Sequence, residues 1–242
     1  MCAETIGVVT DRVRGTIWWD FDGTLVSRPL MWSGAARRLV ERASIACADL
    51  PRPLLDVLNN DMPWHGPNRA HPELSTPDTW WAKVFATYAE GLSRCGWSHA
   101  ATPAGFEALR SEILDARAYS LFEDVVPVLT ALHEQGWRHV IVSNHVPELA
   151  DIVAGLGIRV FFADVITSGL VGYEKPHARM FEAAVRCALP GAPVWMVGDN
   201  PECDCHPVGA FGANAILIRA AAPTFDRHAA DLWQAARLIT GS

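Results

Sequence analysis

Two aspartates, Asp20 and Asp22, follow an apolar, β-favouring run over residues 16–19 and stand just before Gly23. In an extended strand, residues two positions apart point to the same side, so both carboxylates are expected to project together from a strand end. Two like charges at the end of a buried strand repel one another and are costly to hold. A cation would offset that cost, and a hard ion such as Mg²⁺ prefers carboxylate, water and phosphate oxygens. The pair therefore indicates a metal site.

Polar side chains also follow two later apolar runs. Ser143 and Asn144 come directly after the apolar residues 140–142. Asp199 comes after another such run, and Asp204 could return to the same place across a short loop. Right-handed crossovers bring the ends of parallel strands to one edge of a sheet, so these groups are expected near Asp20 and Asp22. An N-cap of a helix is an alternative role for Asp204.

Lys175 adds a cation to this set, because it lies in a loop just before a helix. One lysine, one hydroxyl and up to four carboxylates then converge, which suits phosphoryl transfer. One carboxylate attacks phosphorus and gives an aspartyl-phosphate. A metal ion and a lysine neutralise the phosphoryl oxygens, and a second acid protonates the leaving oxygen.

The elements that must position these residues alternate between strand and helix after residue 122. Strands are predicted over residues 15–20, 140–142, 160–166, 193–197 and 213–218, and helices over 125–135, 147–156, 177–188 and 226–238. This rhythm favours an α/β fold with a parallel, doubly wound sheet and helices on both faces. Such sheets bind ligands outside the carboxyl ends of their strands.

The segment from residue 35 to about 119 is different, because its apolar residues have helical spacing and no strand pattern is found. Thr76 with Pro77, and Thr102 with Pro103, are typical of helix starts. The sequence therefore predicts a helical insertion after the first strand.

With these motifs in place, the chain resembles the haloacid dehalogenase-like (HAD) hydrolase superfamily, in its phosphatase branch with a C1-type helical cap. The four motifs that carry the resemblance occur in the order of the family: Asp20-Phe21-Asp22-Gly23-Thr24, Ser143 after an apolar strand, Lys175-Pro176, and Gly198-Asp199 with Asp204. The resemblance implies a Rossmann-like core domain of residues 15–27 and 120–242. It also implies a helical cap domain of residues 28–119. Residues 1–14, before the first strand, are expected to be an N-terminal leader or a short edge segment.

The resemblance also implies a role for each matching residue. Asp20 would be the nucleophile, and Asp22 the general acid and then the general base, with its backbone carbonyl on the metal. Asp199, and Asp204 directly or through water, would complete the Mg²⁺ site with Asp20. The residues expected to hold the phosphoryl group or the substrate are Gly23, Thr24, Ser143, Asn144 and Lys175.

Asp22 also indicates the class of reaction. Relatives that cleave carbon–halogen bonds lack an acid at this position, because a halide needs no proton to leave. The alkoxide of a phosphate ester does need one. The expected function is a Mg²⁺-dependent phosphatase for a small phosphorylated metabolite. A phosphomutase or other phosphotransferase of the same superfamily, and a non-catalytic HAD-like binding protein, remain alternatives.

Composition limits the possible partners. The 242 residues are 50% hydrophobic with a formal net charge of −7, and basic residues cluster no further than short pairs, so nucleic acid is not an expected partner. No apolar run approaches the ~18 residues that a membrane span needs, and no signal peptide is evident. The six scattered cysteines are expected to be reduced thiols in a cytoplasmic protein. The sequence predicts no particular oligomeric state.

Two further clusters have open interpretations. Cys203, Cys205 and His206 surround Asp204 and could bind zinc, but no second cysteine pair stands at zinc-finger spacing, which favours buried thiols. The polar and aromatic loop with Trp64, His65, Arg69 and His71 either faces the site or is a solvated surface loop.

Overall fold

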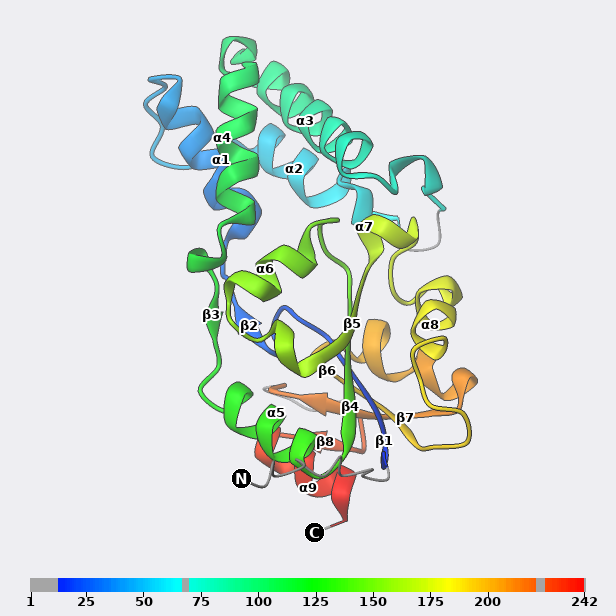
Figure 1. The fold of residues 1–242 in the computed structure, drawn as a ribbon. Helices are drawn as coiled ribbons and strands as arrows, with labels where there is room; N and C mark the ends of the chain where they lie inside the picture. The colour runs from blue at the N-terminus through cyan, green and yellow to red at the C-terminus, as the bar shows by residue number, and fades with distance from the viewer. Residues whose placement is uncertain (1–12, 67–69, 221–224, 242) are drawn as a thin grey trace, which may run out of the picture.

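The structure is a computed structural model that describes residues 13–66, 70–220 and 225–241. Within these ranges the chain forms a six-stranded sheet, all parallel, with strand order β5-β4-β1-β6-β7-β8 (Figure 1). The strands are β1 (Gly15–Trp19), β4 (Trp137–Ser143), β5 (Phe162–Thr167), β6 (Val194–Gly198), β7 (Ala213–Ile218) and β8 (His228–Ala229). The predicted Rossmann-like α/β fold class is confirmed.

The central strand β1 is apolar because both of its faces are covered. All five of its residues are buried. Successive side chains of a strand point to opposite faces, so Trp18 and Trp19 enter different halves of the core. Trp18 lies against Phe181, with 6.5 Å between ring centroids, and Trp19 Nε1 donates to His139 Nδ1 at 3.0 Å on the neighbouring strand β4. Asp20 follows at the carboxyl end of this strand.

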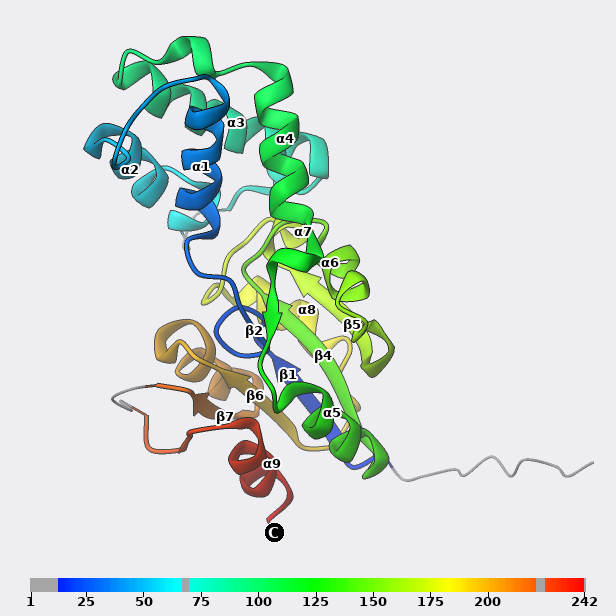
Figure 2. The ribbon, with the colours of Figure 1, turned by 90° about the vertical axis from the view of Figure 1, so that its left-hand side faces the viewer.

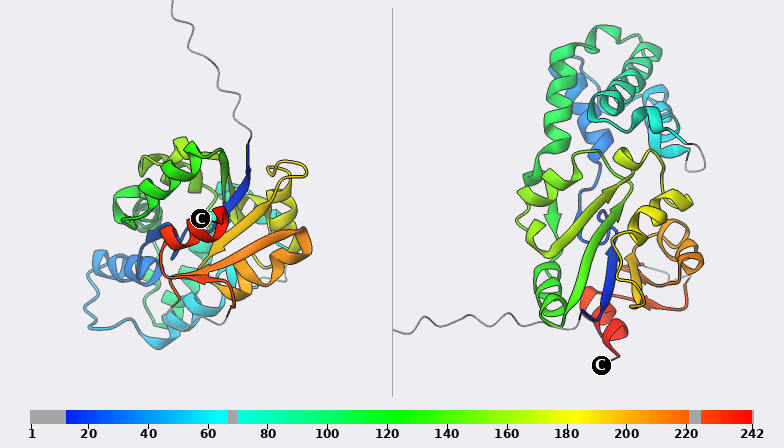
Figure 3. Two further views of the ribbon diagram at one scale, coloured as in Figure 1. Left: turned by 90° about the horizontal axis from the view of Figure 1, so that it is seen from below. Right: turned by 45° about the vertical axis from the view of Figure 1, so that its right-hand side comes forward.

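Helices pack on both faces of the sheet, as Figure 3 shows. One face carries α5 (Val125–Glu134), α6 (Leu149–Gly155) and α9 (Leu232–Thr240), whose apolar residues join the same core cluster as Trp19. The other face carries α8 (Ala178–Val185) and the short helical turns Pro201–Cys205 and Pro207–Phe211, around Trp18. The short α7 (Ser168–Val171) follows β5.

A layer of helices stands beyond the carboxyl ends of the strands (Figures 1 and 2). It contains α1 (Met31–Arg42), α2 (Arg52–Asn60), α3 (Pro77–Arg94) and α4 (Pro103–Leu114), with α2 packed on α3 and α1 on α4. The predicted starts of two helices are confirmed, because the Thr76 and Thr102 hydroxyls accept from Thr79 N and Gly105 N. We call residues 31–114 the helical layer.

Two short strands that the sequence analysis did not predict connect the helical layer to the sheet (Figure 2). β2 (Val26–Ser27) leads into the layer, β3 (Ser120–Leu121) leads out of it, and the two pair in an antiparallel manner. Strands of two residues are too short for a recognisable alternation of apolar and polar side chains. The chain therefore leaves and re-enters the sheet region at one place.

The helix predicted over residues 226–238 is wrong at its start. Residues 228–229 form β8, and α9 begins at Leu232, where the Asp231 carboxylate caps it by accepting from Gln234 N at 2.7 Å. Strand β5 begins at Phe162 rather than at residue 160. Nearly all of the leader predicted for residues 1–14 lies outside the described residues.

Among the described residues, no helix is long and apolar enough to cross a membrane. The five cysteines in these ranges are free thiols.

Candidate active site

Lys175 lies at the centre of the polar groups gathered at the carboxyl edge of the sheet. Its ammonium donates to Asp20 Oδ1 at 2.7 Å and to Asp204 Oδ1 at 2.6 Å, and the residue is only 2% exposed. Burial alone would lower the pKa of Lys175, but the charges of Asp20 and Asp204 outweigh it, so the pKa lies above its ordinary value. The lysine therefore stays charged and holds two carboxylates together.

Asp204 reaches this site because the loop after β6 folds into a compact turn over Pro201–Cys205. The Asn200 side chain caps the turn by accepting from Glu202 N and Cys203 N, while Asp204 Oδ2 accepts from Asn200 N at 3.1 Å. The alternative that Asp204 is a helix N-cap is wrong, because Asn200 has that position. Asp204 points instead to Lys175.

Two glycines leave room for the acidic loop. Gly23 has φ +77°, and a Cβ at this position would lie 2.1 Å from Asp199 Oδ2. A Cβ on Gly198 would lie 2.3 Å from Asp204 Oδ2. These distances are far shorter than a carbon–oxygen contact, so a side chain at either position would push an acidic residue out of place.

Asp20, Asp199 and Asp204 each offer a carboxylate oxygen within 4.8 Å of the others. Burial, with the nearby charge of Asp20, raises the pKa of Asp199 to about 6. Burial and the charge of Asp20 also outweigh the attraction of Lys175 at Asp204, and raise its pKa above the ordinary value. A divalent cation would relieve this repulsion, and a set of oxygen donors fits Mg²⁺. The side chain of Asp22, expected to use its backbone carbonyl, is not in this cluster.

Asp22 lines two cavities between the sheet and the helical layer. About 40% of its side chain is accessible, yet the surrounding protein still desolvates the carboxyl. This desolvation, together with the charges of Asp20 and Asp199, raises the pKa of Asp22 to about 7. At neutral pH the carboxyl is therefore poised to give or take a proton.

The other residues predicted to bind substrate lie close by. Ser143 ends β4 and is 2% exposed, and Thr24 is fully buried. The Asn144 side chain bonds to the backbone of Lys175 twice, through Lys175 N to Oδ1 at 2.6 Å and through Nδ2 to Lys175 O at 3.0 Å. Asn144 thus positions the lysine loop. The substrate-binding roles of these residues and of Gly23 stay predictions.

His145 belongs to none of the predicted site residues, although this histidine directly follows Ser143 and Asn144 at a strand end. His145 Nε2 lies 3.5 Å from Asp22 Oδ2, too far for a strong hydrogen bond. Burial lowers the pKa of His145 to about 3, with a smaller effect from Arg28, so the ring is neutral at pH 7. The ring also packs edge-on against Phe21 at 5.5 Å. His145 therefore forms a neutral wall beside Asp22.

Arg28 was also missed, because an arginine in a loop carries no pattern of its own. Its guanidinium donates to Ile113 O at 2.6 Å and to Glu112 O at 2.7 Å, and lies 4.3 Å from the centre of the Tyr119 ring. Arg28 thereby ties the segment after β2 to the end of α4.

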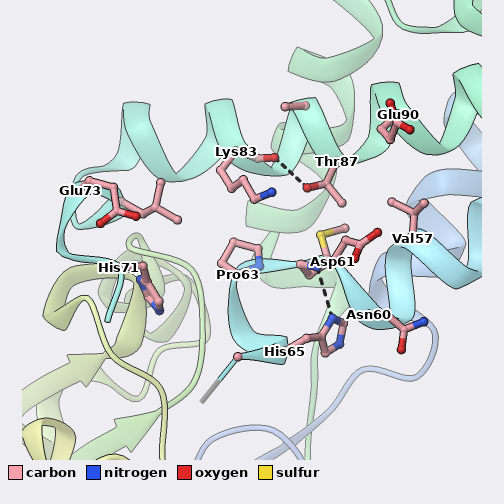
Figure 4. Close-up of a pocket in the computed structure, with 14 residues that line it drawn as sticks. Val57, Asn60, Asp61, Pro63, His65, His71, Glu73, Lys83, Thr87 and Glu90 are labelled. Atoms are coloured by element: carbon pink, nitrogen blue, oxygen red, sulfur yellow. Dashed lines mark hydrogen bonds between the residues drawn. The ribbon is translucent and has the colours of Figure 1, made fainter. Parts of the chain in front are cut away.

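A cavity of about 570 Å³, larger than the two cavities beside Asp22, does not contain the catalytic candidates. It lies inside the helical layer, where Lys83, Thr87 and Glu90 of α3 face the turn that carries His65 (Figure 4). His71 at its edge reaches out of the layer, and its Nε2 lies 3.2 Å from Glu174 Oε1, next to Lys175. This cavity is part of the packing of the helical layer rather than of the acidic site.

The sequence left open whether the polar and aromatic loop around Trp64 and His65 faces the site. Both residues line a cavity with Asp22 and Gly23. His71 is buried, and Arg69 lies outside the described residues. Cys205 is buried. The group of potential metal ligands found among the described residues consists of Asp20, Asp199 and Asp204, and it includes neither the two cysteines nor His206.

The chain belongs to the haloacid dehalogenase-like hydrolase family, whose model matches residues 15–208. In fold it is similar to the HAD-hydrolase YfnB of Bacillus subtilis, determined with bound magnesium. That similarity has a TM-score of 0.67 and 17% identity, and covers 95% of this chain and 99% of the other. The family match confirms the resemblance to the HAD-like superfamily that the four motifs indicated.

Two curated relatives are similar in sequence. Haloacid dehalogenase-like hydrolase domain-containing protein 3 of Mus musculus is 30% identical over 149 residues, which are 61% of this chain and 59% of the relative. Phosphoserine phosphatase of Thermus thermophilus is 30% identical over 143 residues, 57% of this chain and 56% of the relative. The chain thus spans somewhat more than half the length of these relatives.

Proposed function

We propose that the chain is a Mg²⁺-dependent phosphatase that hydrolyses a small phosphate monoester through an aspartyl-phosphate on Asp20. The observation that carries the proposal is the buried contact of Lys175 with Asp20 and Asp204, beside the further carboxylates Asp199 and Asp22. A nucleophile, a cation and a separate acid are the groups that phosphoryl transfer requires. The phosphatase name of the Thermus relative supports the same class of reaction.

The division into domains belongs to the same proposal. Residues 15–27 and 120–242 would form the core domain, and residues 28–119 a helical cap that covers the carboxyl edge of the sheet. The paired strands β2 and β3 would be the connection between the two. A cap of this kind excludes bulk water while the aspartyl-phosphate exists.

In the first step, an Asp20 oxygen attacks phosphorus and the bond from phosphorus to the alcohol oxygen breaks. Asp22 gives its proton to that oxygen as the alcohol leaves. Lys175 stays protonated and holds Asp20 and the phosphoryl oxygens. The raised pKa of Asp22, about 7, leaves the carboxyl protonated in a sizeable fraction of molecules at neutral pH.

In the second step, Asp22 takes a proton from a water molecule, whose oxygen attacks the phosphorus. The bond from phosphorus to Asp20 breaks, inorganic phosphate leaves, and both carboxyl groups return to their first state. The side chains of Asp20, Asp199 and Asp204 and the backbone carbonyl of Asp22 would hold Mg²⁺. The bound ion would supply positive charge to the phosphoryl oxygens. The magnesium in the YfnB structure supports the choice of metal.

Replacement of the nucleophile tests this function. Asp20→Asn removes the attacking carboxylate and should lower release of inorganic phosphate from a generic aryl phosphate on the order of 10⁴-fold. Circular dichroism and the melting temperature serve as controls for the fold. In the wild-type protein, a chelator should remove the activity and added Mg²⁺ should restore it. Near-normal turnover by Asp20→Asn would exclude the mechanism.

A further inference from the structure

Three tryptophans gather over Asp22 from separate parts of the helical layer. Trp32 lies on α1, Trp64 on the short 3₁₀ turn Pro63–His65, and Trp80 on α3. The ring centroids of Trp32 and Trp64 are 4.6 Å apart. The ring centroid of Trp80 lies 6.1 Å from that of Trp32 and 6.0 Å from that of Trp64. Each ring therefore supports the other two, and we call Trp32, Trp64 and Trp80 the tryptophan wall.

A cavity of about 150 Å³ lies between the tryptophan wall and the sheet edge. Met31 and Val146 complete its apolar sides, and Asp22 is its only acidic lining residue among those described. A cavity of this size in an apolar setting holds a single benzene ring. Asp22, the group proposed to protonate the leaving oxygen, lines this cavity and the adjoining one, but only this cavity is lined by all three tryptophans. We therefore place the alcohol part of the ester in this cavity.

Of the polar groups in this cavity, those of Asn144 and Ser168 are already bonded within the chain, whereas Trp80 Nε1 and His145 Nδ1 have no hydrogen-bond partner among the described residues. The Asn144 amide is bonded to the backbone of Lys175, and Ser168 Oγ accepts from His145 N at 3.1 Å. No lysine or arginine is among its described lining residues. A carboxylate or a phosphate on the leaving group would therefore meet Asp22 with no cation to balance it.

Arg28 does not supply that cation. It lines the adjoining cavity of about 500 Å³, which also contains Asp22, Trp32 and Trp64. Both terminal nitrogens of Arg28 donate to backbone carbonyls at the end of α4. These two bonds hold the guanidinium at the end of α4, and Arg28 is not among the lining residues of the smaller cavity.

We propose that the tryptophan wall selects a phosphate monoester whose alcohol is uncharged and carries one small aromatic ring. This inference rests on the proposed phosphatase function and names the substrate class of the same site. Indole rings bind a flat apolar ring by offset or edge-to-face contact, and the ring gains from leaving water. The same wall offers no charged partner to the ammonium and carboxylate groups of a phosphorylated amino acid.

Three substrates test the proposal on the wild-type protein: benzyl phosphate, ethyl phosphate and phosphoserine. Benzyl and ethyl phosphate both release a simple alkoxide, so they differ mainly in the ring. We expect kcat/KM for benzyl phosphate to exceed that for ethyl phosphate by about tenfold to a hundredfold. We also expect phosphoserine to be the poorest of the three.

Trp64→Ala tests the wall itself, because Trp64 is half-buried and its loss should leave the fold intact. This variant should lose most of the preference for benzyl over ethyl phosphate, mainly through a higher KM for benzyl phosphate. Trp233→Ala is the matched control, because Trp233 on α9 is 43% exposed and lies outside the site. If Trp64→Ala does not fold, Trp64→Leu keeps an apolar side chain without the flat ring and serves in its place.

The outcomes separate the two proposals. Absence of hydrolysis of every monoester would overturn the proposed function and this inference with it. Hydrolysis of phosphoserine as efficiently as benzyl phosphate, or an equal loss on both uncharged substrates in the Trp64 variant, would overturn the substrate class alone. A ring preference that the Trp64 variant loses and the Trp233 variant keeps would support it.

Discussion

Lys175 is the residue on which the arrangement of the acidic side chains depends most. It is buried, it contacts Asp20 and Asp204 directly, and its backbone is held by Asn144. A buried lysine is costly unless it is paired, so the carboxylates and the ammonium stabilise each other. Asp22 stands apart from this network, and its separate position is consistent with its proposed use in proton transfer.

The proposed double role of Asp22 predicts a specific kinetic defect. p-Nitrophenyl phosphate has a good leaving group that needs little help from an acid, so Asp22→Asn should still form the aspartyl-phosphate. Its hydrolysis should be slow, because no base activates the water; we expect turnover to fall by about 10²–10⁴-fold. Rapid-mixing measurements should show a burst of about one nitrophenol per active site.

Steady turnover of Asp22→Asn at the wild-type rate would count against both roles. A variant without a burst and without turnover would mean that Asp22 is needed already for the first step with this substrate. The Asp20→Asn variant is the control, since it should give no burst at all.

A second prediction concerns the space that Gly23 leaves for Asp199. Gly23→Ala places a Cβ in contact with Asp199 at a positive φ, and we expect it to raise the Mg²⁺ concentration needed for half-maximal activity at least about tenfold. Gly212→Ala is the matched control. Gly212 has φ +73° and no atom near its added Cβ, so it carries the backbone strain of about 1 kcal/mol without the clash. An equal Mg²⁺ requirement in both variants would show that Gly23 gives the acidic loop no needed space.

Among the elements, the contact between the helical layer and the loop before α8 links the two parts of the molecule near the site. His71 N donates to Gly172 O at 2.9 Å, and the His71 ring lies 3.2 Å from the Glu174 carboxylate. Both side chains are buried. Because Glu174 precedes Lys175, this contact fixes the lysine loop against the helical layer.

This contact should weaken as the pH rises. The Glu174 carboxylate beside the ring outweighs burial and raises the pKa of His71, so the protonated ring binds better in the folded state. The stabilisation is complete below about pH 6.5, the ordinary value for histidine, and is lost as the pH rises through the raised pKa. Hydrogen exchange around His71, corrected for the intrinsic rate, should accelerate over this range.

His71→Gln provides the control for that measurement, because glutamine can still donate to Glu174 but does not titrate. Its exchange rate, corrected in the same way, should change less with pH in this window than that of the wild type. A wild-type protein with the same pH profile as the variant would rule out the charged pair.

For the molecule as a whole, stability in acid depends on histidines that are buried without charge. Burial, with a further effect from His133, lowers the pKa of His139 to about 3. The unfolded chain takes up a proton at about pH 6.5, whereas the folded protein does not until near pH 3. The stability that neutral His139 provides is therefore present above pH 6.5 and is lost as the pH falls, by about 1.4 kcal/mol per pH unit.

His139→Asn tests this prediction, because asparagine can keep the hydrogen bond from Trp19 Nε1 without titrating. Urea unfolding between pH 7 and pH 5 should show a smaller loss of stability in the variant than in the wild type. The raised pKa values of Asp22, Asp199 and Asp204 act in the opposite direction, but equally in both proteins. Parallel profiles for the two proteins would contradict the prediction.

The fold class, and the position of the acidic residues at one edge of the sheet, could be predicted from the sequence. The apolar run before Asp20 can only be a buried strand, and parallel strands must end at one edge, so Asp20, Ser143 and Asp199 had to lie close together. The capped starts of α3 and α4 were predictable for a similar reason, because a threonine before a proline satisfies free backbone groups locally. These features depend on neighbours along the chain and on general rules of handedness.

Other features follow from tertiary packing, which no local pattern encodes. The packing sets the direct contacts of Lys175 with Asp20 and Asp204, the separate position of the Asp22 side chain, and the capping role of Asn200. It also brought Trp32, Trp64 and Trp80 together from segments far apart in the sequence, and paired His71 with Glu174. Such contacts depend on how whole elements pack, and packing is fixed by shape and burial over the entire chain rather than by the spacing of residues within a segment.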